Sequence, residues 1–440
     1  MKKKYTLIVL LLAVITLLSP CSKQPDEEKK KDTAGDSLSG EYQGLIQVPD
    51  QPLNIQVTLE KEKEWIGTIS IPVQGIQDYP LSNVNISDPD VYFTMNIQGQ
   101  TLTFTGEREK ESITGTFTQN GMSFPFELTK QNQTSSPSED EAEQFLSVNT
   151  DHGTLYGELE LPDGNGPHPV VLIIPGSGPT DRNGNTPTMP GKNNSLKMLA
   201  EELAEQGVAS VRYDKRGAGK NHEAAIPEED TRFEHFIHDA VAWVQLLKTD
   251  ERFSKVGILG HSQGSLVGMA AAEIEGADLF ISIAGAGQPV DQVLDDQLKE
   301  SLPEHLYDES KTILARLKRQ EAVEDISQEL YSVFRPSILE FLTSWMQYDP
   351  AEEIRKLDIP VLIIQGTHDI QVSEKEARTL HEASPQSKLL IIEGMNHVLK
   401  EAPANREDNV KTYSDPELPL SDGLISGIID FLQREGFLEK

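Results

Sequence analysis

Hydrophobic and polar residues follow two different patterns in two regions of the chain. Between residues 40 and 130, apolar and polar positions alternate with a period of two in short segments such as LNIQVTL, VYFTMNIQG and TLTFTGE, and Gly, Asn, Asp and Pro separate these segments. Such alternation is typical of strands that bury only one face. The pattern therefore predicts a small antiparallel β domain over residues 40–130.

From about residue 145 onward, short apolar runs alternate with amphipathic segments. The runs are rich in Val, Ile and Leu, as in HPVVLIIPG, VASVRYD, KVGILG, DLFISIAG, IPVLIIQG and KLLIIEG. Runs of this kind suit parallel strands that are buried on both faces. The intervening segments, such as NSLKMLAEELAEQG, have the spacing of helices. Strands that alternate with helices predict an α/β fold over residues 145–440, with a doubly wound and mostly parallel sheet.

This alternation breaks once, between about residues 288 and 355. The segment is long, charged and helical in period, for example in ILARLKRQ and ILEFLTSWMQY. It predicts a helical cap inserted into the α/β domain. Aromatic residues of the cap, among them Phe341 and Trp345, have two interpretations. They form a packing face against the sheet domain, or they form an acyl-binding wall over the reactive centre.

The N-terminal segment has the pattern of an export signal. Three lysines precede an apolar run from Tyr5 to Leu18, and Cys21 follows as the only cysteine of the chain. The run is short for a membrane span and typical of a signal-peptide core. LSPC resembles the lipobox of bacterial lipoprotein signal peptides, with Pro20 where that family usually has a small residue. The resemblance implies a signal peptide over residues 1–20 and a lipid anchor on Cys21. An ordinary signal peptide or an uncleaved anchor is the alternative, and every version places the rest of the chain outside the cytoplasm.

Composition narrows the picture further. Residues 21–39 and 131–144 are polar and predict a disordered tether and a linker. The formal net charge is −32 and the pI is about 4.6, so nothing would neutralise the phosphates of a nucleic acid. A single cysteine excludes an intrachain disulfide and a cysteine metal site. The histidines of HFIHD lie on one helix face, but no third ligand pattern accompanies them, so we expect no metal.

The motif GHSQG lies where a predicted buried strand meets a helix-like run. Ser262 stands between Gly260 and Gly264. A serine on such a tight turn adopts a strained backbone conformation, and glycines two positions away on either side avoid clashes. The turn lifts the hydroxyl toward solvent, and the start of the helix adds N–H groups that favour negative charge. The pattern predicts that Ser262 is a nucleophile.

A serine hydroxyl needs a base, and the base needs an orienting acid. Asp369 follows the strand-like run IPVLIIQG, and His397 follows KLLIIEG. Each comes just after the carboxyl end of a predicted parallel strand, where open α/β sheets build their sites. Asp358 is the rival for the acid, and His368 and His381 are the rivals for the base.

These motifs and the turn YDKRGAGKN resemble the α/β-hydrolase superfamily over about residues 145–437. The loop PGSGPTDRNG makes the chain most similar to a bacterial esterase subgroup described as dipeptidyl-aminopeptidase-like. The resemblance implies that Ser262 is the nucleophile, His397 the general base and acid, and Asp369 the orienting carboxylate. No metal or organic cofactor is required by this chemistry.

The resemblance also implies an oxyanion hole made of two backbone N–H groups. These are the N–H of Gln263, which follows the nucleophile, and the N–H of Ser177 in the loop after an earlier strand. Pro175 stands in that loop where many relatives have histidine. Arg182 of the same loop either lines the pocket mouth or fixes the loop.

The sequence therefore predicts a lipid-anchored, extracytoplasmic serine hydrolase that cleaves small carboxylic esters through an acyl-enzyme on Ser262. One alternative is a serine peptidase of the prolyl-oligopeptidase type, although the β segment is too small for the propeller of those enzymes. Another alternative is a cell-envelope binding lipoprotein, in which the β domain binds a wall or lipid ligand and the hydrolase domain is secondary.

Overall fold

The computed structural model describes residues 38–48, 53–61, 65–71, 76–87, 89–97, 100–119, 122–130, 144–187 and 191–439. The chain divides into two compact units, one holding the described residues from 38 to 130 and the other those from 144 to 439. Cys21, the predicted signal peptide and most of the predicted tether and linker lie outside the described residues.

The first unit is a single antiparallel sheet in which neighbours along the chain are mostly neighbours in space. Its order is β4-β3-β2-β1-β9-β8-β7-β6-β5, so the first and last strands pair with each other. The strands are β1 (Gly40–Ile46), β2 (Leu53–Lys61), β3 (Trp65–Ile71), β4 (Ile76–Pro80), β5 (Asn83–Ser87), β6 (Asp90–Ile97), β7 (Gln100–Glu109), β8 (Ser112–Gln119) and β9 (Met122–Lys130).

The core of this unit follows from the period-two pattern. In β2 the alternate residues Ile55, Val57 and Leu59 are buried, and the residues between them are more exposed. The rings of Phe93 and Phe104 stack at 4.6 Å between centroids, within a larger aromatic cluster. One buried face on each strand is the arrangement that the alternation predicts.

The second unit contains an eight-stranded sheet of order β10-β11-β13-β12-β14-β15-β16-β17. The strands from β13 to β17 are parallel, and β11 is antiparallel to both of its neighbours. This sheet is therefore doubly wound and mostly parallel. Its strands are β10 (Phe145–Thr150), β11 (Gly153–Glu160), β12 (His168–Ile174), β13 (Ala209–Tyr213), β14 (Phe253–His261), β15 (Leu279–Ile283), β16 (Val361–Gly366) and β17 (Lys388–Ile392).

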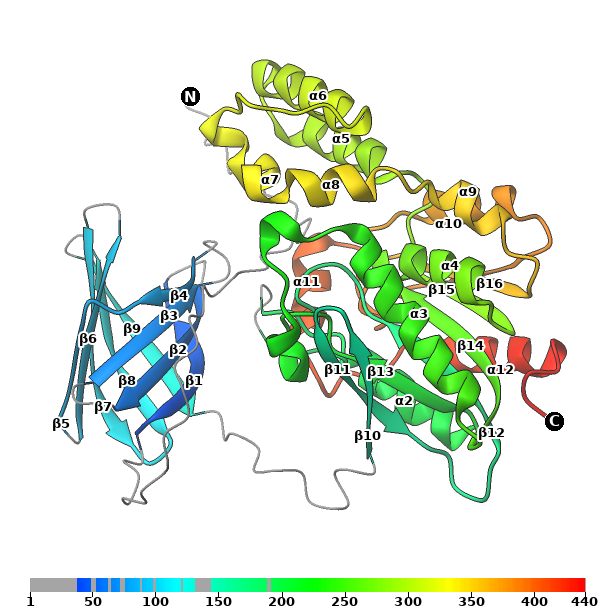
Figure 1. The fold of residues 1–440 in the computed structure, drawn as a ribbon, viewed down its shortest axis with the longest axis horizontal. Coiled ribbons are helices and arrows are strands. Elements are labelled where there is room, and N and C mark those ends of the chain that lie inside the picture. The colour runs from blue at the N-terminus through cyan, green and yellow to red at the C-terminus, as the bar shows by residue number, and fades with distance from the viewer. Residues whose placement is uncertain are drawn as a thin grey trace. The chain divides into compact units, whose positions relative to one another are not determined.

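Helices cover both faces of this sheet, which explains why its strands are apolar runs. In β12 the side chains of Val170 and Leu172 belong to one buried cluster, and those of Val171 and Ile173 belong to another. The first cluster includes α3 (Phe233–Thr249), α4 (Gln263–Glu275) and α10 (Glu374–Ala383). The second includes α2 (Ser195–Glu205) and α12 (Leu424–Arg434). Figure 1 shows these helices around the central strands.

The insert between β15 and β16 is helical, and Figure 1 shows most of its helices grouped together. Its core residues, such as Phe334, Leu342 and Met346, join the same buried cluster as α3 and α4. The insert is thus packed onto the sheet unit rather than separate from it. Its helices are α5 (Val290–Ser301), α6 (Glu304–Lys318), α7 (Tyr331–Phe334), α8 (Leu339–Trp345) and α9 (Pro350–Arg355).

Within the described parts of the chain, no helix is long and apolar enough to cross a bilayer. The same residues hold no group of three or more His, Cys, Asp or Glu side chains that could bind a metal ion.

Candidate active site

Ser262 occupies a sharp turn between β14 and α4. Its backbone has φ 55° and ψ −122°, a region that residues with a side chain rarely adopt. The N–H of Ser262 donates to the carbonyl of Ile283 at 2.9 Å, and this bond holds the turn against β15. A strained, hydrogen-bonded turn of this kind fixes the direction of the serine side chain.

The two glycines of the motif have a steric explanation. A β-carbon on Gly260 would lie 2.2 Å from the carbonyl oxygen of Gly264, and one on Gly264 would lie 2.3 Å from the carbonyl oxygen of Ile174 at the end of β12. No side chain fits at either position. The spacing of GHSQG is therefore a requirement of the strand-to-helix turn.

Asp369 and His397 are brought together by the ends of β16 and β17. The His397 Nδ1 and an Asp369 carboxylate oxygen are 2.8 Å apart, and both side chains are buried. Burial raises the pKa of Asp369, but the interaction with His397 and the amide donors of the loop outweigh burial and hold the pKa below its usual value. An ionised carboxylate at this distance keeps the proton on Nδ1, so Nε2 is the proton acceptor.

The loop after β16 fixes the carboxylate. One oxygen of Asp369 accepts the backbone N–H groups of Gln371 and Val372 at 2.8 and 2.9 Å. The other oxygen, which faces His397, also accepts the amide of Gln365 at 3.0 Å. The rival residues lie elsewhere: Asp358 is exposed, and His368 bonds to the carbonyl of Ala402 through its Nδ1.

His261, the residue before the nucleophile, connects the two halves of the site. Its ring lies 4.9 Å from the His397 ring, and its Nε2 lies 2.8 Å from the His397 carbonyl. Since a carbonyl only accepts, Nε2 carries the proton. Burial, with the neighbouring His397, lowers the pKa of His261 to about 4, so the ring is neutral at pH 7. The structure thus anchors the backbone of His397 to the serine turn, a role that the sequence reasoning missed.

No hydrogen bond between the Ser262 hydroxyl and the His397 ring is recorded among the described residues. Catalytic hydrogen bonds of this kind are often long in a free enzyme and tighten only in the complex with substrate. The structure therefore brings Asp369 and His397 together, and it places Ser262 next to His261, which bonds to the His397 backbone.

The loop after β12 approaches the serine from the other side. A β-carbon on Gly176 would lie 3.2 Å from the Ser262 β-carbon. The next residue, Ser177, lines the same pocket as Ser262 and Gln263. For the backbone N–H groups of Ser177 and Gln263, the described residues provide no acceptor. Both donors therefore remain free for a negatively charged oxygen.

Lys215, from the turn after β13, supports these donors and was not singled out from the sequence. Its buried Nζ donates to the carbonyl of Gly176 at 3.1 Å and to the side-chain oxygen of Gln263 at 2.7 Å. The carbonyl of Gly176 and the N–H of Ser177 belong to one trans peptide group and point in opposite directions. A donor on that carbonyl therefore orients the Ser177 N–H away from Lys215 and polarises it.

The free-energy cost of burying the Lys215 ammonium is only partly offset by nearby groups. Burial lowers the pKa of its ammonium to about 7, against a smaller opposing effect of Asp239. Asp239 itself is paired with Arg216 at 2.5 Å. The Nζ also lies 4.3 Å from the centre of the Phe236 ring. No acidic side chain among the described residues bonds directly to Lys215.

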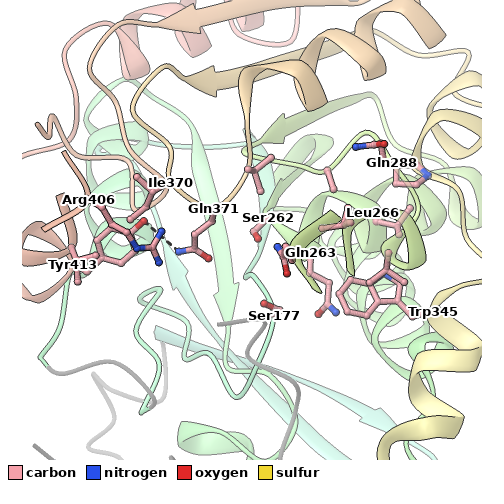
Figure 2. Close-up of a pocket in the computed structure, with 17 residues that line it drawn as sticks. Ser177, Ser262, Gln263, Leu266, Gln288, Trp345, Ile370, Gln371, Arg406 and Tyr413 are labelled. Carbon is pink, nitrogen blue, oxygen red and sulfur yellow. Dashed lines mark hydrogen bonds between the residues drawn. The ribbon is translucent and has the colours of Figure 1, made fainter. Parts of the chain in front are cut away.

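A cavity of about 250 Å³ opens over Ser262. Its lining is Ser177, Ser262, Gln263, Leu266, Ala286, Gln288, Val290, Val293, Gln297, Trp345, Pro350, Ile370, Gln371, Val372, Arg406, Val410 and Tyr413. Figure 2 shows Ser262 near the middle, with Leu266 and Trp345 on one side and Arg406 and Tyr413 on the other. Trp345 thus lines the cavity, and its ring also stacks on that of Phe233.

The other two expected substrate contacts need correction. The Arg182 guanidinium bonds to Glu158 at 2.5 Å and to the buried Asp214 at 2.8 Å, so it fixes its loop and does not line the cavity. Phe341 is 2% exposed and packs against Phe236 and other aromatic side chains. The helical period of α8 did not show that Trp345 faces the cavity while Phe341 is buried.

The unit from residue 144 to 439 has the fold of the α/β hydrolases, and it carries a serine on a strained turn and a buried Asp–His pair after the ends of its parallel strands. In agreement, residues 192–401 match the protein family described as serine aminopeptidase, S33 (Hydrolase_4).

Relatives with curated descriptions match parts of the chain. Esterase EstD of Thermotoga maritima is 33% identical over 251 residues, which are 56% of this chain and 58% of that protein. A probable aminopeptidase, YbaC of Bacillus subtilis, is 31% identical over 97 residues, which are 22% of this chain and 29% of that protein. The chain thus spans 58% and 29% of the lengths of these relatives.

Among solved structures, Est1E from Butyrivibrio proteoclasticus is similar to 66% of this chain over 98% of its own length, with 16% identity and a TM-score of 0.43. The structure of XC6422 from Xanthomonas campestris, described as an α/β serine hydrolase without lid, is similar to 66% of this chain over 93% of its length, with 17% identity and a TM-score of 0.37.

Proposed function

We propose that the protein hydrolyses carboxylic esters through an acyl-enzyme on Ser262. The single observation that carries this proposal is the convergence at one sheet edge of a strained serine turn and a buried Asp369–His397 pair. The similarity of the α/β unit to an esterase supports the choice of ester over other acyl substrates.

In the first step, the Ser262 hydroxyl oxygen attacks the ester carbonyl carbon, and its proton passes to Nε2 of His397. The carbonyl oxygen becomes an oxyanion and is held by the N–H groups of Ser177 and Gln263. Removal of one such donor typically costs about 3–4 kcal/mol of barrier. The Lys215 bond to the Gly176 carbonyl orients one of these donors.

In the second step, the carbon–oxygen bond to the alcohol breaks, and Nε2 of His397 returns the proton to the leaving oxygen. Water then attacks the acyl-enzyme with His397 as base, which releases the acid and restores the serine. Asp369 remains ionised throughout and stabilises the imidazolium, in accord with its lowered pKa.

The test is covalent labelling with a fluorophosphonate, followed by turnover of short-chain p-nitrophenyl esters. The variant Ser262→Ala should lose both labelling and turnover and keep its thermal unfolding temperature. The matched control is Ser426→Ala, which changes an exposed serine on α12. Turnover by Ser262→Ala at the rate of the unchanged protein would refute the proposal.

Peptide hydrolysis is the second candidate, because the matching family is described as serine aminopeptidase. A pair with one acyl group, p-nitrophenyl butyrate and butyryl p-nitroanilide, separates the two activities, and amino-acid p-nitroanilides extend the test. Faster turnover of the anilides than of the esters would favour the peptidase.

We propose further that the protein is a lipid-anchored lipoprotein outside the cytoplasm. The support is the N-terminal pattern of lysines, an apolar run and Cys21. The variant Cys21→Ala should release the protein from the membrane fraction and abolish incorporation of labelled fatty acid. Unchanged membrane association in that variant would refute the anchor.

A further inference from the structure

The cavity over Ser262 is chemically unequal on its two sides. Leu266 of α4 and Trp345 of α8 lie on one side, where the lining side chains are uncharged (Figure 2). On the other side lie Gln371, Arg406 and Tyr413, from the segments that follow Asp369 and His397. A substrate that spans the serine therefore meets two different surfaces.

Arg406 is the only charged side chain among the described residues that line the cavity. This is unexpected in a chain with 71 acidic and 39 basic residues. Several surface cations, such as Lys411 and Arg434, pair with a neighbouring carboxylate, but Arg406 makes no ion pair and no side-chain hydrogen bond within the described part of the chain. Its guanidinium is exposed at the cavity rim, on α11 (Arg406–Lys411).

Two polar groups accompany this charge. The Gln371 amide and the Tyr413 hydroxyl are 3.3 Å apart and face the same part of the cavity. Burial is the main cause that raises the pKa of the Tyr413 phenol well above its ordinary value, and the positive charge of Arg406 acts on it in the opposite direction. A guanidinium beside a neutral amide and a neutral phenol is a set of donors for an anion. Planar guanidinium groups bind carboxylates through two parallel hydrogen bonds.

The reaction geometry assigns this side of the cavity to the leaving alcohol. The oxyanion is held between Ser177 and Gln263, and the leaving oxygen must lie toward His397, which protonates it. Gln371 comes two residues after Asp369, and Arg406 and Tyr413 lie in the segment after His397. The acyl group is then left with the uncharged side next to Leu266 and Trp345.

We propose that the preferred substrates are esters of an alcohol that carries a carboxylate, with that carboxylate bound by Arg406 and an apolar acyl group against Leu266 and Trp345. This inference rests on the proposed ester hydrolysis, and it adds the substrate class and a specificity-determining residue.

The test is a matched pair of esters, 4-(butanoyloxy)benzoate and 4-(butanoyloxy)benzamide, which share the acyl group and differ in the charge of the alcohol. The protein should cleave the benzoate with the higher kcat/KM after correction for spontaneous hydrolysis. Arg406→Gln should lower kcat/KM for the benzoate about tenfold or more, and should change the benzamide by less than about twofold. The control Arg434→Gln removes the same charge from an exposed site on α12 and should change neither ester.

Equal kcat/KM for the two esters, an equal loss on both esters in Arg406→Gln, or the same loss in Arg434→Gln would overturn the inference. Arg406→Lys keeps the charge without the planar fork and should retain an intermediate preference. Raising the salt concentration should weaken the preference for the benzoate, since the rim is exposed.

Equilibrium binding separates failure of this inference from failure of the proposed function. Ser262→Ala should bind the benzoate ester more tightly than the benzamide ester by calorimetry, and addition of Arg406→Gln should remove the difference. If the unchanged protein cleaves neither ester but this binding difference persists, ester hydrolysis is refuted and carboxylate recognition stands. Equal affinities for the two esters would overturn the recognition itself.

Discussion

Asp369 and Lys215 are two buried ionisable groups of the candidate active site, and their surroundings favour opposite charge states. The carboxylate of Asp369 accepts hydrogen bonds from His397, Gln365 and two backbone amides. The ammonium of Lys215 has two neutral acceptors and an aromatic ring, and its acidic neighbour Asp239 is already paired with Arg216. The pKa of each group is lowered, but for Asp369 this favours the charged form and for Lys215 the neutral one.

The difference reflects what each group does. In the proposed reaction a charge is needed at Asp369, because it stabilises the imidazolium that would form on His397. At Lys215 the need is for N–H donors, and a neutral amine still has two, one for each of its acceptors. The surroundings of Asp369 thus stabilise the charge that the proposed chemistry requires. The surroundings of Lys215 favour the neutral amine, which still supplies the directed hydrogen bonds.

The largest expected effect on kcat comes from removing the charge of Asp369. Asp369→Asn should lower kcat for an ester by a factor on the order of 10⁴, because an amide stabilises the wrong tautomer of His397 and cannot support an imidazolium. Steady-state kinetics with a p-nitrophenyl ester measures this loss. The control Asp358→Asn changes an exposed carboxylate after α9 and should leave kcat unchanged. A larger loss in Asp358→Asn than in Asp369→Asn would reverse the assignment of the acid.

Removing the amine of Lys215 should have a smaller effect on kcat. Lys215→Met deletes both donors and keeps an unbranched side chain, so the Ser177 amide loses its support but not its place in the chain. We expect kcat to fall by about tenfold, less than the 10²–10³ that loss of an oxyanion donor itself costs. KM should change little, which distinguishes this role from substrate binding. Lys388→Met, at an exposed position that begins β17, is the control. An unchanged kcat in Lys215→Met would remove Lys215 from the catalytic scheme.

The third effect is on stability rather than on activity, and it tests the protonation of Lys215 directly. The folded pKa is about 7 and the ordinary value is 10.5, so between these pH values the unfolded chain binds a proton that the folded chain does not. The free energy of unfolding should therefore rise with pH in this window, by about 1.4 kcal/mol per pH unit from this group. Below pH 7 both the folded and the unfolded chain bind this proton, so the free energy of unfolding is lowest there and no longer changes with pH through this group.

Urea unfolding of the unchanged protein and of Lys215→Met, at about pH 7.5 and about pH 9, isolates this term, since most other titrating groups are common to both proteins. The difference between the two free energies should shift by about 2 kcal/mol in favour of the lysine form at the higher pH. A difference that does not vary with pH would mean that the lysine stays charged in the folded protein.

Much of the architecture follows from local pattern, because the burial of a strand is visible in its own sequence. A strand with one buried face alternates, as in β2, and a strand buried on both faces is a continuous apolar run, as in β12. The nucleophile turn is equally local, since Gly260 and Gly264 are required by atoms within or next to the turn. The doubly wound, mostly parallel sheet was predicted on this basis, the α/β-hydrolase fold was predicted from the resemblance of the motifs, and both are confirmed.

What the sequence could not supply depends on contacts between distant segments. The roles of Lys215 and His261 arise from bonds to Gly176 and His397, and nothing in a local pattern predicts those distances. The two roles left open for Arg182 could not be decided for the same reason, since its partners Glu158, on β11, and Asp214, after β13, are distant in the chain. The catalytic roles of Ser262, Asp369 and His397 stay predictions, since they depend on a reaction rather than on the fold alone.

The pairing of the first and last strands of the β unit has a mechanical consequence. Because β1 and β9 are antiparallel, with Tyr42 opposite Lys130, the chain enters and leaves this unit at neighbouring points. A stretching force applied to the two ends would break the hydrogen bonds between β1 and β9 one residue pair after another. The force would not act on all the pairs at once. Such a unit should yield under low tension, and it could be excised by genetic splicing without leaving a gap for the remaining chain to bridge.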